Sequence, residues 1–566
     1  MTALALGLEI SAAIAILLFI VAFSYRQVCI AYPNGGGSYS VSKRNLGRTI
    51  SLVAASALMI DYVMTVAVST TSAVEQITSA VPSLSDGRVE IGVAAIGIIA
   101  IGNLRGIREA GNIFALPTYR FVGSALLMIA LGTVRIVVFG DHGSFSQAAV
   151  DQAVAQSGGT IQNVGIILLL RAFAGGAVAL TATEAIATGV PAFQPPEPRN
   201  AATTLTAMAT LLGVLFIGIT FLAVNFGITA IDVPVNQTVV SQVARAVYGD
   251  GTIGFLAFQA FTALILFLAA NTSYNAFPRL LAILPGDGHA PRQFALRGDR
   301  LAFSYGIVIL SLIAATLIVV FHGETHLLIP MYAVGVFIDF TISQAGMIRH
   351  WLRERPAGWR RRLVINATGC LLTATVAVVV IYAKAPTSLL VLAIVPLLVL
   401  LMVAIWRQYE GQAAELRVAD DLVFRGPHRR QRAIVPVNGL NRAVVQAVNF
   451  ARTTTSDVRG VYVTEDRDEG ESLRRRWERQ LPGVPLVIVE SPYRAVVEPI
   501  VAYLDVLDLQ LEAAAEAPVT VVVLPEYVAK QWWDRVLYNQ TAKRLKAALV
   551  GRDHTVIADV PYRREH

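Results

Sequence analysis

Residues 57–69 read Ala57-Leu-Met-Ile-Asp-Tyr-Val-Met-Thr-Val-Ala-Val-Ser69, an apolar run that carries a single carboxylate, Asp61. On a helix Asp61, Thr65 and Ser69 share one face, with successive side chains about 5–6 Å apart. Carboxylate and hydroxyl oxygens are the ligands that hard cations prefer, and Tyr62 adds another hydroxyl beside them. The stretch predicts a helix that handles a small cation, with interhelical hydrogen bonding by Thr and Ser as the alternative.

The rest of the chain has the composition of a membrane protein. Of its 566 residues, 55% are hydrophobic and 15% are charged, whereas soluble domains average about 25% charged residues. About 20 apolar residues form a helix that crosses a bilayer. Runs of this kind predict eleven spans, near residues 3–23, 48–73, 90–104, 115–139, 164–190, 205–231, 253–283, 303–321, 326–346, 364–383 and 387–405. Dense charge begins at residue 406, so we expect a transporter-like membrane domain over 1–408 and a soluble domain over 409–566.

The loops between the spans alternate in basicity. Loops 24–47, 284–302 and 347–363 are rich in Lys and Arg, whereas 140–163 contains neither. Cytoplasmic loops collect basic residues, so we expect a multi-pass protein of the bacterial inner membrane with a cytoplasmic C-terminus. The formal charge of +7 reflects this orientation and does not indicate binding to nucleic acid.

An odd number of spans with a cytoplasmic C-terminus places Met1 outside the cell. A transporter of twelve helices with both ends inside is the usual arrangement. We therefore expect the first helix to be absent, through a misassigned start codon or a natural truncation, and we expect the chain that begins at Met1 not to transport.

Ionisable residues inside spans are costly and are functional candidates. Besides Asp61, the sequence places Arg171 and Glu184 in span 164–190 and Asp339 in span 326–346. Glu184 is interpreted as a proton carrier or a structural partner. Tyr332 begins the same span as Asp339, where it either binds an ion or anchors the helix at the membrane interface.

Two adjacent glycines, Gly175 and Gly176, interrupt span 164–190 and are followed by Thr181. Glycine weakens a helix by about 1 kcal/mol, and unwound helices in transporters expose carbonyl groups that bind cations. The segment predicts a broken transporter helix, with close helix packing as the alternative.

Several stretches carry a family resemblance. Ala31-Tyr-Pro-Asn-Gly-Gly-Gly-Ser-Tyr-Ser40 resembles the loop after the second helix in the APC superfamily of amino-acid, polyamine and cation transporters. Asp61–Ser69, Arg297–Ser304 and Leu328–Phe337 resemble, more specifically, bacterial KimA-type potassium importers.

The resemblance implies a LeuT-like inverted-repeat fold, symport of potassium with protons, no cofactor, and a homodimer held together by the cytosolic domains. The ion-site residues that it implies are Asp61, Tyr62, Thr65, Ser69, Thr181 and Tyr332. The residues expected to couple protons are Asp61, Glu184 and Asp339, and no metal is expected besides the transported alkali cation.

The sequence departs from the family pattern in two places. The family's first helix, which carries an acidic residue of the ion path, has no counterpart here. Asp339 stands where relatives are expected to carry a small or hydroxyl residue, so it either adds a charge to the pathway or pairs with a basic neighbour.

The C-terminal part alternates apolar strands with amphipathic helices. Strands are expected near 433–437, 458–463, 485–489, 519–524 and 555–558, with helices near 440–452, 470–480, 494–513 and 530–549. Such alternation predicts a parallel, doubly wound α/β domain, which resembles the universal-stress-protein type. The fourth strand runs into Leu524-Pro-Glu-Tyr-Val without a glycine pair, so we expect dimerisation and regulation and no ATP binding. The resemblance leaves regulation by a cyclic dinucleotide open.

Two other functions remain as alternatives. The same fold serves amino-acid and polyamine permeases, and the missing first helix fits a transport-inactive, truncated paralogue or sensor. The sequence contains no nucleophile–base constellation and no cluster of metal ligands, so an enzyme is not expected.

Overall fold

The computed structural model describes residues 7–35, 37–105, 111–143, 173, 175–176, 182–228, 237–295, 304–385, 387–415, 431–491, 496–511, 519–527, 541–552 and 554–562. The chain divides into two compact units, Met1–Arg417 and Val418–His566. Each unit is considered by itself.

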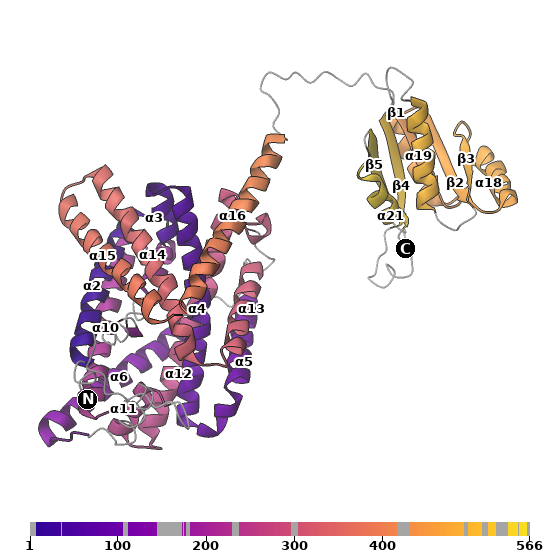
Figure 1. Ribbon diagram of the computed structural model, residues 1–566. Coiled ribbons are helices and arrows are strands. Elements are labelled where there is room, and N and C mark those ends of the chain that lie inside the picture. The colour runs from indigo at the N-terminus through magenta and orange to yellow at the C-terminus, as the bar shows by residue number, and fades with distance from the viewer. Residues whose placement is uncertain are drawn as a thin grey trace. The chain divides into compact units, whose positions relative to one another are not determined.

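The first unit is helical (Figure 1). Within its described residues nine helical segments are long and apolar enough to cross a membrane, and the apolar helix α13 is shorter. The α-helices are α2 (Gly7–Ala31), α3 (Gly37–Asn45), α4 (Arg48–Ala80), α5 (Arg88–Leu104), α6 (Gly111–Phe139), α9 (Ala182–Thr188), α10 (Glu197–Asn225), α11 (Val239–Tyr248), α12 (Ile253–Ile283), α13 (Ser304–Val320), α14 (Thr325–Glu354), α15 (Trp359–Ala383) and α16 (Leu389–Glu415). Short 3-10 helices join some of them: η1 (Pro82–Gly87), η3 (Val190–Ala192), η4 (Leu284–Asp287) and η5 (Arg292–Ala295).

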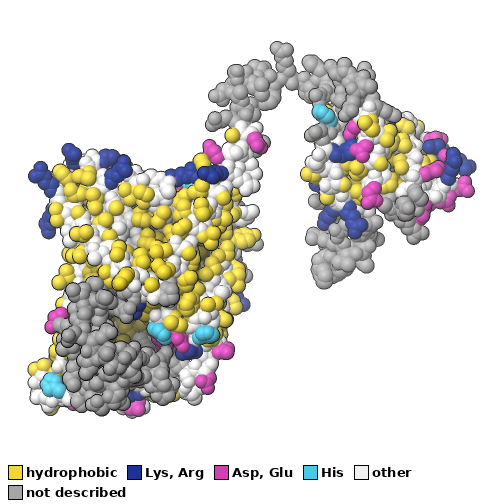
Figure 2. All heavy atoms as spheres, in the orientation of Figure 1, with side chains coloured by type: hydrophobic (Ala, Val, Ile, Leu, Met, Phe, Trp, Pro, Cys, Tyr) yellow, Lys and Arg dark blue, Asp and Glu magenta, His cyan; other side chains and the backbone are white. Residues whose placement is uncertain are grey.

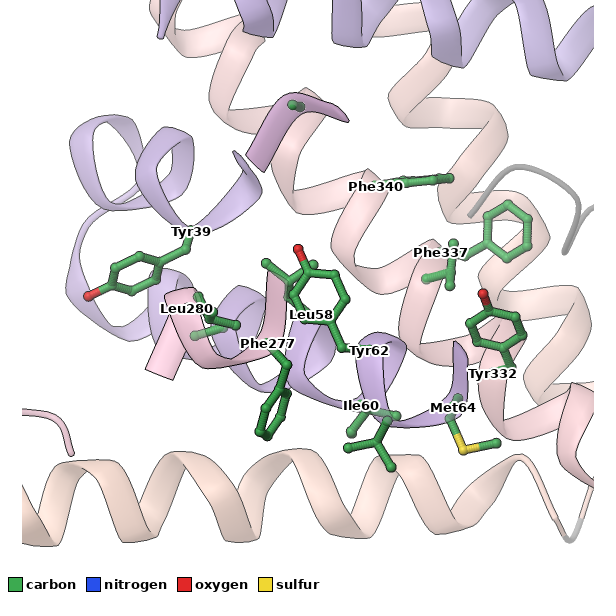
Figure 3. Close-up of a cluster of buried hydrophobic side chains, with 14 of the residues drawn as sticks. Tyr39, Leu58, Ile60, Tyr62, Met64, Phe277, Leu280, Tyr332, Phe337 and Phe340 are labelled. Atoms are coloured by element: carbon green, nitrogen blue, oxygen red, sulfur yellow. The ribbon is translucent and has the colours of Figure 1, made fainter. Parts of the chain in front are cut away.

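Helices α4 and α14 form the centre of this unit. In their most apolar windows 78% and 67% of the residues are buried, against 17% for α16. Helix α4 packs on α12 and α14, while α14 also packs on α15 and α3. Aromatic and aliphatic side chains fill the space between them, including Leu58 and Tyr62 of α4 and Phe337 of α14 (Figure 3). Polar groups on α4 and α14 therefore lie in the interior and not against lipid.

Each predicted span outside 164–190 overlaps with a helix of the structure. The predicted span 164–190 lies mostly outside the described residues, and α9 corresponds to its C-terminal end. The helices run beyond the predicted spans, because loss of hydropathy marks the edge of the membrane and not the end of a helix. Helix α14 continues to Glu354 and α15 begins at Trp359, so most of the predicted loop 347–363 is helical. Likewise α16 continues to Glu415, past the change in composition at 406 and the predicted end of the membrane domain at 408.

Basic side chains gather at one end of the helical unit. Figure 2 shows Lys and Arg at the end from which α16 extends, and predominantly hydrophobic side chains over the middle of this face. Helix α3, with Lys43 and Arg44 in its last turn, lies at the same end (Figure 1). The distribution agrees with the predicted orientation, in which this end faces the cytoplasm.

The second unit contains a five-stranded sheet in the order β3-β2-β1-β4-β5, and all four strand pairs are parallel. Its strands are β1 (Gln431–Val437), β2 (Asp457–Thr464), β3 (Leu486–Glu490), β4 (Val519–Tyr527) and β5 (Thr555–Tyr562). Its described helices are α17 (Arg442–Thr454), α18 (Arg467–Gln480), α19 (Val497–Leu511) and α21 (Thr541–Leu549). The predicted α/β domain with a parallel sheet is confirmed.

Apolar side chains lie on both faces of this sheet. Along β1, Ala433 and Val435 enter one core together with Trp477 of α18, while Ile434 enters the other with Leu504 of α19. Successive strand residues point to opposite faces, so a strand covered on both sides is apolar throughout. This explains the unbroken apolar runs in the sequence.

An ion-pair group stabilises the start of β2. Asp457 accepts hydrogen bonds from Nε of Arg432 at 3.0 Å and from Nε of Arg459 at 2.9 Å. Burial raises the pKa of the Asp457 carboxyl, but the hydrogen bonds from Arg459 and Arg432 outweigh it, and the net pKa is lowered. The carboxylate is therefore held in its charged form in the folded state.

Candidate functional site

Polar side chains form a ladder between α4 and α14, which run in opposite directions. Near one end Oγ1 of Thr325 donates to Oγ1 of Thr71 at 3.0 Å. Two turns along α4, Oγ1 of Thr65 and the hydroxyl of Tyr332 are 2.8 Å apart. Thr65 and Tyr332 were predicted as ion-site residues from different spans, and the structure brings them together.

One helical turn beyond Thr65, three carboxylates meet. Asp61 of α4, Glu184 of α9 and Asp339 of α14 are 4%, 1% and 1% exposed. The carboxyl of Glu184 is within electrostatic range of both others, and Asp61 is within range of Asp339. We call Asp61, Glu184 and Asp339 the carboxylate cluster.

The N-terminus of α3 closes one side of the carboxylate cluster. The backbone N–H of Ser38 donates to Oε1 of Glu184 at 2.8 Å, and the hydroxyl of Ser38 donates to Oδ1 of Asp339. The preceding Gly37 has a φ of +48°, and a Cβ there would overlap the side chains of Glu184 and Thr188. Glycine is therefore required at this close approach.

Hydroxyl groups surround the carboxylate cluster on its other sides. The Tyr62 hydroxyl donates to Oγ1 of Thr188 at 3.2 Å, and Thr188 in turn donates to Oε1 of Glu184 at 3.4 Å. The hydroxyl of Tyr25, on α2, faces Glu184 and Ser343. Figure 3 shows Tyr62 and Tyr332 within the same buried region between α4 and α14.

Each member of the carboxylate cluster keeps one oxygen without a hydrogen-bond partner in the described structure: Oδ1 of Asp61, Oε2 of Glu184 and Oδ2 of Asp339. Among the described residues, no Lys, Arg or His forms an ion pair with them. An unpaired buried carboxylate costs several kcal/mol, and three together repel one another. The cluster is stable only when protons or cations neutralise it.

The described residues contain no group of three His, Cys, Asp or Glu side chains close enough to hold one metal ion. The carboxylate oxygens of the cluster lie beside the neutral hydroxyls of Ser38, Tyr62 and Thr188. Such a mixture of few charges and several neutral oxygens suits monovalent cations and protons.

Other predicted residues lie further away or outside the description. Ser69 is half-buried one turn from Thr65, on the side away from Asp61, and in the described structure it is joined by no hydrogen bond to Thr65 or Tyr332. Thr181 and Arg171 fall outside the described residues. Pairing of Asp339 with a basic neighbour is not found among the described residues, and its described partner is Ser38.

Sequence reasoning did not single out Ser38, Thr188, Tyr25 or Ser343. Ser38 was quoted only within a glycine-rich motif, and the feature that could have revealed it is a hydroxyl directly after three glycines, where the backbone approaches another element closely. The others look like ordinary helix residues, and only the assembled fold gives them carboxylate neighbours.

Comparison with known proteins fits this arrangement. Residues 3–405 match the family described as Amino acid permease, which defines the class: a multi-pass membrane transporter of the amino acid permease family, and not an enzyme. Residues 429–562 match the family described as KimA potassium transporter C-terminal domain. The chain is 38% identical over 558 residues, 98% of its own length and 89% of the relative's, to the Potassium transporter KimA of Bacillus subtilis (strain 168). The chain thus belongs to the KimA family of transporters.

Proposed function

We propose that this protein is a secondary transporter that takes up potassium together with protons. The main support for this proposal is the buried carboxylate cluster. Its carboxylates have unpartnered oxygens, and no cationic side chain among the described residues pairs with them. The relative that is named a potassium transporter supports the choice of substrate.

The ladder between α4 and α14 supports a path for a dehydrated cation. Thr65 and Tyr332 offer neutral oxygens 2.8 Å apart, and Asp61 offers an unpartnered carboxylate oxygen one turn further along α4. Potassium is a hard cation that prefers oxygen ligands. Neutral hydroxyls replace water around the ion, while Asp61 balances its charge. We include Ser69, Thr181 and Tyr62 in this ion path, as the resemblance implies.

Proton coupling requires that the cation and a proton occupy the carboxylate cluster together. A cation beside Asp61 balances the charged form of Asp61, while repulsion among the three carboxylates favours a bound proton on Glu184 or Asp339. Because the three groups interact, they titrate as a set and not singly. Ion binding at one carboxylate then changes proton occupancy at the others, which couples the two fluxes.

The soluble unit serves as the dimerisation and regulatory domain in this proposal, as the resemblance implies. Its parallel sheet and two cores make it a compact body. Deleting residues 418–566, which leaves α16 intact, should lower the dimer fraction measured by light scattering in detergent. An unchanged dimer fraction would remove this role from the soluble unit.

The transport proposal is tested with the full chain reconstituted in proteoliposomes, with ⁸⁶Rb⁺ as a tracer for potassium. An inward proton gradient should accelerate uptake, and a protonophore should abolish the acceleration. Glu184→Gln should weaken the response to the gradient, while Glu90→Gln, on an exposed first turn of α5, should leave it unchanged.

The two alternatives give different results in the same experiment. Uptake of labelled amino acids or polyamines without uptake of ⁸⁶Rb⁺ would assign the chain to an organic substrate. Absence of uptake for all of them, in correctly inserted protein, would identify a transport-inactive paralogue, which is the outcome that the sequence-based expectation of a missing first helix predicts and the transport proposal does not.

A further inference from the structure

Helix α3 contacts the carboxylate cluster through Ser38 and the 3-10 helix η4 through Tyr39 and Lys43. We propose that Ser38 is a positioning residue for transport, and that α3 acts as an inner lid which Asp287 of η4 holds over the cluster. This inference rests on the proposed function. It concerns residues outside the predicted ion site: Ser38 and Tyr39 lie in the motif that carries the family resemblance, but that resemblance gives them no role in the ion site.

Ser38 is placed to link two carboxylates that come from different helices. Its backbone N–H binds Glu184 of α9 and its hydroxyl binds Asp339 of α14. Each carboxylate keeps its second oxygen unpartnered in the described structure, so Ser38 fixes the direction in which these free oxygens point. Ser38 itself is completely buried.

The start of α3 is also suited to negative charge. The first N–H groups of a helix lack partners within the helix and carry partial positive charge. Here that end meets Glu184 without space for a side chain at Gly37. If α3 moved away, Glu184 and Asp339 would lose the hydrogen bonds from Ser38 together. Both carboxylates would then depend on a proton or a cation to balance their charge.

Tyr39, the residue after Ser38, and Lys43, one turn further along, bind α3 to η4. The buried Tyr39 donates its hydroxyl to Oδ2 of Asp287 at 2.6 Å, and Nζ of Lys43 lies 2.5 Å from Oδ1. We call these contacts the Asp287 clasp. The side chain of Lys43 is 49% exposed, so the ion pair is weak in water, and the Tyr39 bond contributes more. The contacts of the Asp287 clasp are weak enough to break and re-form during a transport cycle.

These contacts predict the sequence of events on the cytoplasmic side. With the clasp closed, Ser38 covers the carboxylate cluster and holds Glu184 and Asp339 in place. With the clasp open, α3 withdraws and the cluster becomes accessible from the basic end of the unit. The charged groups that face Asp339 in the described structure are Glu184 and Asp61, so their shared protons respond to the position of Ser38.

Ser42 offers a matched control for Ser38. It is equally buried on the same helix, but within the described structure its hydroxyl donates only to the backbone carbonyls of Ser38 and Tyr39. Concentration and pH dependence of ⁸⁶Rb⁺ uptake should be measured for Ser38→Ala, Ser38→Thr and Ser42→Ala at matched membrane expression.

Ser38→Ala should raise the KM for Rb⁺ about tenfold, the loss typical of one hydrogen bond to a charged group, and should shift the pH profile. Ser38→Thr, which keeps the hydroxyl, should restore both, and Ser42→Ala should match the parent. If Ser38→Ala and Ser42→Ala give the same KM and pH profile while the parent transports Rb⁺, the positioning role of Ser38 is refuted. A parent that does not transport Rb⁺ refutes the proposed function instead.

The clasp has an independent test that leaves Ser38 in place. Tyr39→Phe removes only the hydroxyl that binds Asp287. It should shift the population toward the open lid and raise the KM for external Rb⁺ about three- to tenfold, because apparent affinity falls with the fraction of competent protein. Tyr382→Phe, on the exposed face of α15, is the control. Equal KM values for Tyr39→Phe and Tyr382→Phe would overturn the lid.

Discussion

Replacing Asp61 with Asn tests the charge that the proposed mechanism requires. The side chain keeps its shape but can no longer neutralise a cation. Asp61 is 4% exposed, so water screens it poorly. At an effective dielectric constant near 20 and a separation of about 4 Å, one carboxylate contributes about 4 kcal/mol to holding a cation, which is roughly a thousandfold in affinity. Glu184 and Asp339 still attract the ion, so we expect a loss of about a hundredfold.

The measurement is ⁸⁶Rb⁺ uptake against Rb⁺ concentration, at several pH values and at matched membrane expression. Asp86→Asn, an exposed carboxylate in η1, is the control and should behave as the parent. At millimolar Rb⁺, uptake by Asp61→Asn should be negligible. Uptake at the parental rate and with parental pH dependence would show that Asp61 does not bind the cation, and Glu184 or Asp339 would take its place.

Three further predictions concern single contacts. Thr65→Val removes the hydroxyl that lies 2.8 Å from the hydroxyl of Tyr332. The loss of about 1 kcal/mol of binding free energy should raise the KM for Rb⁺ roughly three- to tenfold and leave maximal uptake unchanged. An unchanged KM would exclude Thr65 from the ion path. In the soluble unit, Gly460→Ala would place a Cβ 2.7 Å from a buried tryptophan, so it should destabilise the isolated unit by about 1–3 kcal/mol in urea, whereas Gly551→Ala, in open space, should not. The lowered pKa of Asp457 stabilises the fold at pH values above the unfolded pKa of about 3.9, and this contribution is lost as the pH falls through the folded pKa. The free energy of unfolding should therefore drop in acid, and Asp457→Asn should make that drop smaller.

The sequence predicts the order of helices and strands because hydropathy and periodicity are local properties. It locates helix ends less well. Charged residues can continue a helix into water, as between residue 347 and Glu354 of α14. No local sequence signal distinguishes such a charged helix end from a loop. The parallel sheet was predictable because its strands are buried on both faces and are therefore apolar throughout.

The carboxylate cluster was predictable only in part. A carboxylate in an apolar run identifies itself, so Asp61, Glu184 and Asp339 each stand out. Their convergence depends on how α4, α9 and α14 pack, which no local pattern states. The role of Ser38 depends on a backbone N–H, and every residue except proline has one.

The separation of the three carboxylates along the chain also matters while the protein is being made. Helix α4 is synthesised before α9, and α9 before α14, so Asp61 enters the bilayer before either partner of the cluster exists. An aspartate at the centre of a lone membrane helix costs about 2.5–3.5 kcal/mol on insertion scales. The long apolar stretches of α4 on both sides of Asp61 offset that cost, and the nascent helix is best tolerated with its carboxyl protonated. We therefore expect Asp61 to enter the bilayer with a proton bound, so that the mature site can begin its first cycle with this carboxyl protonated.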